Sequence, residues 1–211
     1  MEEIHTCTDF LRANSLIEHG ISCKNFDLAN IVPRLTDGNI LDMGSSGGSC
    51  ILENAVRRKL TGRKVGVDLE YTDATVSPEG IELIKGDLMS TPFNQHSFDF
   101  ITCLSVIEHG VDFNQLAKEC ARLLVREGKL FITFDYWPEK VNTEGLQLYG
   151  LPWNILSRDE AMALITACQL HGLHITSEID WTVMDAVINP QYCSPFPGIS
   201  YTFGLFEFEK K

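Results

Sequence analysis

Apolar residues follow one another along this chain in two alternating patterns, and each pattern predicts one kind of element. Continuous apolar runs that end in a turn signal predict buried strands, at residues 39–42, 64–69, 81–84, 97–104 and 129–134. Between them, apolar side chains three or four positions apart predict helices near residues 51–60 and 116–124. This alternation indicates an α/β fold whose mostly parallel sheet has helices on both faces.

Both flanks of the chain depart from this alternation. Helical spacing within residues 9–35 predicts two helices before the first strand. After the fifth strand, a polar and aromatic segment over residues 135–157 precedes a helix near residues 158–170. The last two strands are expected near residues 173–181 and 201–209.

The connection between the second and third strands is short. Few residues separate Leu69 from Ile81, and Pro78 further restricts a helix there. We therefore expect a shortened or irregular crossover at this point.

Composition and charge limit the classes of protein to which the chain can belong. Its 211 residues suffice for one core, so residues 1–211 are expected to form a single domain. The formal net charge of −12 disfavours a nucleic-acid partner, since the surface repels polyanions. Residues 1–5 are acidic and no apolar run approaches the ~20 residues that would span a bilayer, which disfavours a signal peptide and membrane insertion.

The cysteines indicate a reducing environment. There are seven, an odd number, with no CxxC pair and no histidine at zinc-binding spacing. We therefore expect free thiols, a cytoplasmic location and no metal site.

The first strand runs into a glycine-rich turn, Asp42-Met43-Gly44-Ser45-Ser46-Gly47-Gly48. Glycine allows the backbone to turn sharply off a strand and to approach a ligand closely. Taken alone, this sequence also fits a generic turn between a strand and a helix.

Acidic residues follow the next strands. Asp68 ends the second strand, where a carboxylate can accept hydrogen bonds from both hydroxyls of a ribose, and Glu70 is a second candidate for that role. Asp87 follows the third strand, where taken alone it fits a turn residue equally well. The fourth strand leads into Glu108 and His109.

With these four motifs in this order, residues 39–211 resemble the class I S-adenosylmethionine-dependent methyltransferases of the small-molecule type. The resemblance implies a three-layer Rossmann-like sandwich, with a seven-stranded sheet in the order 3-2-1-4-5-7-6 and the last strand antiparallel. It implies S-adenosylmethionine as the cofactor, although Ser46 stands where the family's middle glycine is expected. The residues implied to bind the cofactor are Asp42, Gly44, Ser45, Ser46, Gly48, Asp68, Leu69, Asp87, Leu88 and Leu104.

Two residues are candidates for a catalytic base. Methyl transfer to a hydroxyl needs in-line alignment and a group that takes the hydroxyl's proton. His109 is the first candidate, because histidine titrates near neutral pH and the end of the fourth strand faces the ligand crevice. A loop histidine bonded to backbone fits the same position. Asp135, at the end of the fifth strand, is the second candidate, and its alternative role is to cap the turn that follows.

The acceptor side of the site is expected to be built from loops. Residues 136–157 and 182–200 are predicted substrate-side loops, and residues 1–38 are predicted to flank or cap the site. Their aromatic residues and prolines suit a concave wall for a small molecule or sugar, methylated at a hydroxyl. Alternatively, the tryptophans only cover the edge of the core. The sequence leaves a homodimer open.

Two other functions stay open. A nicotinamide-dependent oxidoreductase would need Gly-x-Gly-x-x-Gly, a series that Gly44, Ser46 and Ser49 do not supply. A methyltransferase-like domain that binds a partner without catalysis is kept open by Ser46 and the short second crossover.

Overall fold

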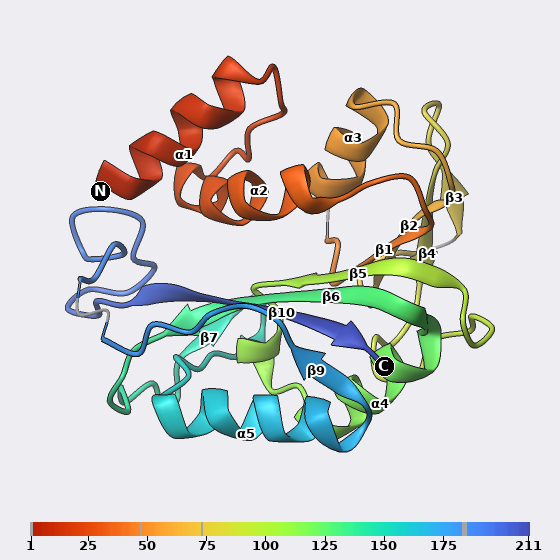
Figure 1. Ribbon diagram of the computed structural model, residues 1–211. Helices are drawn as coiled ribbons and strands as arrows, with labels where there is room; N and C mark the ends of the chain where they lie inside the picture. Colours follow the sequence, from red (N-terminus) through yellow and green to blue (C-terminus); the bar gives the residue numbers. More distant parts are fainter. Residues whose placement is uncertain (1, 47, 73, 183–184) are drawn as a thin grey trace.

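The computed structural model describes residues 2–46, 48–72, 74–182 and 185–211. Gly47 of the glycine-rich turn and residues 183–184 of the predicted substrate-side loop lie outside this part. The centre of the molecule is an eight-stranded sheet in the order β3-β4-β2-β1-β5-β6-β10-β9 (Figure 1). Its strands are β1 (Ile40–Met43), β2 (Lys64–Asp68), β3 (Thr75–Val76), β4 (Ile81–Lys85), β5 (Phe98–Leu104), β6 (Leu124–Tyr136), β9 (Leu173–Ile175) and β10 (Thr202–Lys210).

The strand directions confirm the predicted sheet. β4, β2, β1, β5 and β6 pair in parallel, and β10 lies antiparallel between β6 and β9. Numbered without β3, these seven strands have the order 3-2-1-4-5-7-6. The additional strand, β3, pairs antiparallel with the outer edge of β4.

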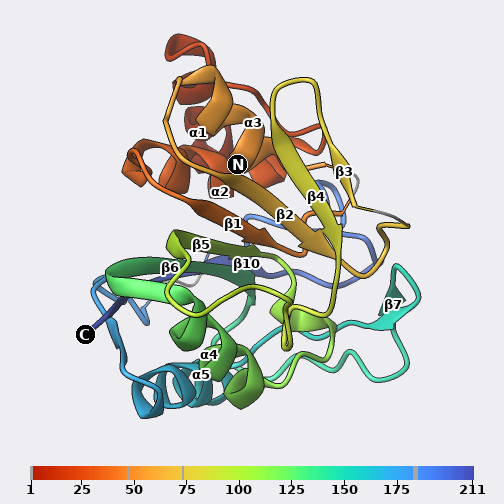
Figure 2. The same cartoon turned by 90° about the vertical axis from the view of Figure 1, so that its right-hand side faces the viewer.

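Helices cover both faces of the sheet and give three layers (Figures 1 and 2). One face carries α1 (Glu2–Ala13), α2 (Asn25–Ile31) and α3 (Cys50–Arg57), and the other carries α4 (Phe113–Leu123) and α5 (Arg158–Leu170). Three short 3₁₀ helices are η1 (Ser22–Lys24), η2 (Val32–Arg34) and η3 (Ile107–His109). A separate hairpin of β7 (Gln147–Leu148) and β8 (Leu151–Pro152) lies within the predicted segment 135–157.

Local hydrogen bonds explain where several helices begin. The Ser49 hydroxyl accepts the Leu52 N–H at the start of α3. At α5, Ser157 and Glu160 form a reciprocal capping box. Such side chains satisfy N–H groups that have no partner inside the helix, and α5 begins where the sequence predicts it.

Three expectations about elements need correction. The first N-terminal helix, α1, begins before the predicted range and already ends at Ala13, since Ser15 adopts a left-handed backbone with φ of 55°. The strand predicted at residues 173–181 ends at Ile175. Beyond it, the Glu207 N–H of β10 donates to the Ser177 hydroxyl, a side-chain acceptor in place of a backbone carbonyl. The second crossover is irregular, as predicted, and its described residues form β3 in place of a helix.

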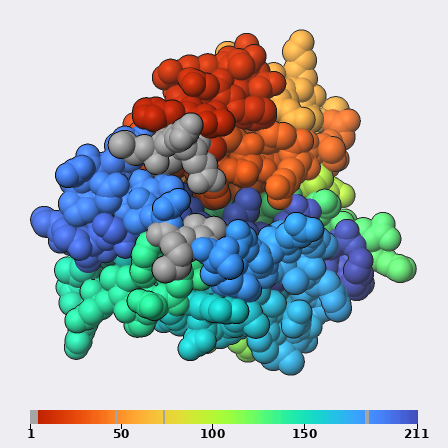
Figure 3. Space-filling view, turned by 60° about the vertical axis from the view of Figure 1, so that its left-hand side comes forward, coloured from red at the N-terminus to blue at the C-terminus, as the bar shows by residue number. Residues whose placement is uncertain are grey.

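Three groups of buried apolar side chains hold these layers together. One lies between the sheet and α4 and α5, and a second lies between the sheet and α1, α2 and α3. A third gathers Cys23, Trp153, Ile188, Tyr201 and Phe203 from the N-terminal segment, both predicted substrate-side loops and the start of β10. On the face shown in Figure 3, the C-terminal part of the chain, in blue, lies against the N-terminal helices, in red and orange.

Candidate active site

The glycine-rich turn lies at the carboxyl end of β1 and is packed too closely for side chains. Gly44 has a left-handed backbone with φ of 80°, and its N–H donates to the Val67 carbonyl at 2.8 Å. A Cβ atom placed on Gly44 would lie 2.3 Å from Val106 Cγ2. The turn therefore needs glycine here, and it brings the ends of β1 and β5 into contact.

Asp42 lies buried beneath this turn. The Thr102 hydroxyl of β5 donates to Asp42 Oδ1 at 2.5 Å. Burial raises the pKa of Asp42 to about 6, although hydrogen bonds from Ser49 and Thr102 oppose the shift. Asp42 thus anchors the turn between β1, β5 and the start of α3.

The segment after β2 lies against the same turn. The Tyr71 hydroxyl donates to the Ser45 carbonyl and lies 3.0 Å from Ser45 Oγ. The Ser46 hydroxyl donates to Glu70 Oε2 at 2.6 Å, so the residue that departs from the family pattern has a specific partner. Tyr71 has no signal in the sequence, because a contact between two loops leaves no periodic pattern.

Asp68 and Leu69 form the tip of β2. Asp68 Oδ1 accepts the Glu70 N–H at 2.8 Å. Leu69 is 60% exposed, so its apolar side chain is uncovered. A carboxylate next to an uncovered apolar surface fits the ribose and base of an adenosine, while Glu70 is already bonded to Ser46.

Asp87 takes the turn role that the sequence left open. It is exposed, and its Oδ1 accepts the Met89 N–H at 2.8 Å. The predicted neighbours Leu88 and Leu104 are partly buried, and Leu104 ends β5 on the same edge of the sheet. Gly48 is also in this region, with a left-handed φ of 116°.

His109 has one ring nitrogen fixed by the chain. It ends η3, and its Nδ1 lies 3.2 Å from the Pro152 carbonyl of β8. A carbonyl only accepts hydrogen bonds, so Nδ1 carries the proton of the neutral ring and Nε2 holds a lone pair. Burial lowers the pKa of His109, although the bond to Pro152 opposes this, and the neutral form is thereby favoured.

Asp135 is more enclosed than His109. It is 3% exposed, and the Trp153 indole N–H donates to its Oδ2 at 2.8 Å. Burial raises its pKa, although the charge of Lys24 opposes the shift. Asp135 and His109 influence each other's pKa, so the structure brings both candidate bases to the ends of β5 and β6.

Three further charged residues in this region were missed as site candidates. Lys24 and Asp27, from η1 and α2, lie beside Asp135 and Glu108, and all four influence one another's pKa values. Glu108 belonged to a recognised motif but was given no role. Only tertiary packing brings residues 24 and 27 to the sheet, so no local spacing identifies them.

The comparisons with known proteins agree with this geometry. Residues 41–132 match the methyltransferase domain family. The uncharacterized methyltransferase YcgJ of Bacillus subtilis is 29% identical over 108 residues, which are 47% of this chain and 42% of YcgJ. The matched region thus spans less than half of that relative's length.

Solved structures share the fold. The crystal structure of Bacillus subtilis YcgJ has a TM-score of 0.59 at 18% identity and covers 87% of this chain and 97% of that chain. A SAM-dependent methyltransferase from Methanosarcina mazei has a TM-score of 0.56 at 16% identity, with 83% and 93% covered. The [4+2]-cyclase SpnF has a TM-score of 0.52 at 19% identity, with 72% and 58% covered.

Residues 41–132 thus match a methyltransferase domain, in agreement with the resemblance to the class I S-adenosylmethionine-dependent methyltransferases seen in the sequence. These matches support S-adenosylmethionine as the cofactor. No helix within the described residues is long and apolar enough to cross a membrane.

Proposed function

We propose that this protein transfers the methyl group of S-adenosylmethionine to a hydroxyl of a small molecule or sugar. The observation that carries the proposal is the fixed ring of His109. Its Nδ1 is held by the Pro152 carbonyl, which leaves the lone pair of Nε2 available to take a proton.

The cofactor-binding residues proposed here surround the carboxyl ends of β1, β2 and β5. Gly44 would leave room for the methionine part, Asp68 would accept hydrogen bonds from the ribose, and Leu69 would cover the base. Ser45, Ser46 and Gly48 would complete the turn against the ligand. When bound, S-adenosylmethionine supplies a methyl group on a positively charged sulfur, which leaves as a neutral thioether.

The chain's own residues would then orient the acceptor and remove its proton. His109 would accept the hydroxyl proton on Nε2 as the oxygen attacks in line. Asp135 is held by Trp153 and buried, so its proposed contribution is to bind and position the acceptor. No group of three or more His, Cys, Asp or Glu residues that could hold a metal ion is found among the described residues.

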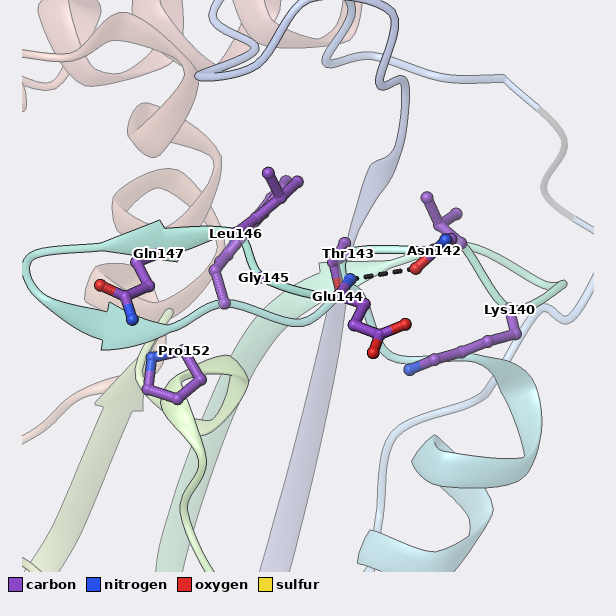
Figure 4. A pocket seen from close by; sticks show the side chains of 10 residues that line it. Lys140, Asn142, Thr143, Glu144, Gly145, Leu146, Gln147 and Pro152 are labelled. Carbon is purple, nitrogen blue, oxygen red and sulfur yellow. Dashed lines mark hydrogen bonds between the residues drawn. The ribbon is translucent and has the colours of Figure 1, made fainter.

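A hollow near His109 and Asp135 is the proposed entrance for the acceptor. It has a volume of about 680 Å³ and is lined by residues 140–147 with Pro152 and Trp153 (Figure 4). This volume lies in the usual range for small-molecule sites, roughly 300–1,000 Å³. Pro152 contacts His109 and Trp153 contacts Asp135, so the hollow borders both candidate bases.

Methyl transfer from tritiated S-adenosylmethionine to a panel of sugars and hydroxylated small molecules tests this proposal. His109→Gln should lower the transfer rate about 10²-fold or more, since general bases contribute on that scale. His174→Gln, at an exposed histidine of β9, is the matched control and should leave the rate unchanged. If His109→Gln keeps the wild-type rate, the proposed base is wrong.

A non-catalytic role is the competing proposal. It predicts that S-adenosylmethionine binds but that no panel member becomes labelled, and the same assay separates the two. The odd number of cysteines and the lack of a CxxC pair support the proposal of a reducing, cytoplasmic location.

A further inference from the structure

A buried group of charged side chains lies on the acceptor side of the proposed site. It consists of Lys24, Asp27, Glu108 and Asp135, and we call it the buried charge cluster. Its carboxylates are almost inaccessible: Glu108 is 1% exposed, and Asp27 and Asp135 are each 3% exposed. Burying charge in this way is costly unless partners compensate for the lost water.

Each carboxylate of this cluster has one oxygen without a hydrogen-bond donor. Asp27 Oδ1, Glu108 Oε2 and Asp135 Oδ1 are all buried without a partner. Among the ion pairs of the described residues, none joins Lys24 to these carboxylates within 4 Å, and its ammonium donates to Ser105 Oγ instead. Buried polar atoms are nearly always satisfied in native proteins, so three orphan acceptors in one place indicate a missing donor.

The charges in the cluster do not balance. Three carboxylates face one ammonium, and burial raises the pKa of Glu108 well above its usual range and that of Asp27 to about 6. Burial acts to lower the pKa of Lys24, but the charges of Asp135, Asp27 and Glu108 outweigh it and raise that pKa. If Glu108 is protonated and Asp27 and Asp135 are ionised, the cluster carries two negative charges against the one positive charge of Lys24.

Aromatic rings enclose the cluster. The Lys24 ammonium lies 4.8 Å from the centre of the Phe203 ring. The Trp153 ring, whose N–H binds Asp135, packs against Tyr201 with centroids 5.6 Å apart. Aromatic faces attract cations, so rings and carboxylates together form surroundings that favour a positively charged nitrogen.

The cluster lies beside residues that line two hollows, and it adjoins the glycine-rich turn. Trp153 lines the hollow of Figure 4, and Phe203 lines a second hollow of about 390 Å³. Ser105, which binds Lys24, directly precedes Val106, the contact of Gly44. A ligand at the cluster would thus lie beside the proposed cofactor site.

We propose that the acceptor carries an amino group, cationic at neutral pH, that donates to the orphan oxygens of Asp27, Glu108 and Asp135. The acceptor class is then an amino sugar or a hydroxylated amine, anchored by its nitrogen while a hydroxyl faces His109. This inference rests on the proposed function, because only a methyltransferase would use the bound amine as its methyl acceptor.

Calorimetry on the full chain saturated with S-adenosylhomocysteine tests the inference. The probes are two pairs that differ in one group: glucosamine against glucose, and tyramine against 4-(2-hydroxyethyl)phenol. In at least one pair the amine should bind about tenfold tighter or more, because hydrogen bonds to charged groups are the stronger ones. Equal binding within both pairs, or no binding by any probe, would overturn the inference.

Two isosteric variants locate the preference. Glu108→Gln and Asp27→Asn each keep the side-chain volume, and each should reduce the preference for the amine while leaving the affinity for S-adenosylhomocysteine unchanged. Glu178→Gln removes the same charge from an exposed residue that lines the second hollow and should leave the amine preference unchanged. An amine preference that survives both cluster variants would contradict the site.

Failure of the two proposals is distinguishable. If the wild-type chain does not bind S-adenosylhomocysteine, the proposed function fails. If it binds S-adenosylhomocysteine but shows no amine preference, only the buried charge cluster is wrongly assigned.

Discussion

A methyl group added at Gly44 tests whether the glycine-rich turn is built around its contact with β5. In Gly44→Ala the new Cβ would lie 2.3 Å from Val106 Cγ2 and 3.1 Å from Val106 Cγ1, on a backbone with φ of 80°. A left-handed backbone costs an L residue about 1–2 kcal/mol. Overpacking of a filled site adds about 1–3 kcal/mol. The free energy of unfolding should therefore fall by about 2–5 kcal/mol.

Gly80 provides a matched control for the backbone part of this cost. Its φ is 83°, and a Cβ there would meet nothing within 4 Å. Gly80→Ala should thus cost only the left-handed backbone, about 1–2 kcal/mol. The difference between the two variants isolates the clash with Val106. Adding Val106→Ala to Gly44→Ala removes both clashing methyl groups and should recover most of that difference.

Urea denaturation of the three variants and the wild type gives the required free energies. Calorimetry with S-adenosylhomocysteine on the same samples reports whether the turn still accepts a ligand. We expect weaker binding in Gly44→Ala, because relief of the clash must move the turn or the start of η3. If Gly44→Ala costs no more than Gly80→Ala, the reasoning about the close contact is wrong.

Three further predictions concern charge and exposure at the site. The rate of methyl transfer should fall as the pH is lowered, with a midpoint below 6.5. The reason is that His109 must be neutral to act as a base and that burial lowers its pKa. A midpoint at or above 6.5 would contradict this. Burial raises the pKa of Asp27 from 3.8 to about 6. As the pH rises, Asp27 therefore loses its proton in the unfolded protein before it does so in the folded protein. The free energy of unfolding should fall between these two pH values. Urea denaturation of Asp27→Asn at pH 4 and pH 7 should show a smaller fall than the wild type, and an equal fall would count against the assignment. Leu69→Ser should weaken binding of S-adenosylhomocysteine without loss of stability, because the side chain is 60% exposed; unchanged affinity, measured by calorimetry, would remove Leu69 from the site.

The sheet could be predicted from the sequence because its signals are local. Each buried parallel strand is a continuous apolar run, and the turn at Gly44 is marked by glycines. The end of β9 could not be predicted, since it depends on the Ser177 hydroxyl and a residue 30 positions away. β3 was missed for a similar reason, because it is two residues long and exists through pairing with β4.

The candidate site was predictable only in part. Asp68 and Asp135 lie at the carboxyl ends of their strands and His109 follows one, and parallel strands bring these ends to one edge. Lys24 and Asp27 reach the same edge from η1 and α2, so their proximity to Asp135 is a property of the tertiary fold. The orphan oxygens of the buried charge cluster likewise become visible only once burial is known.

The central claim is that the crevice at the ends of β1, β2 and β5 binds S-adenosylmethionine. Calorimetric titration of the wild type and of Asp68→Ala with S-adenosylmethionine tests it most directly. The account predicts one-to-one binding by the wild type, weakened in Asp68→Ala by about 1–3 kcal/mol, because a hydrogen-bond acceptor for the ribose hydroxyls is lost. Absence of binding by the folded wild type, or equal affinity in the two proteins, would contradict it.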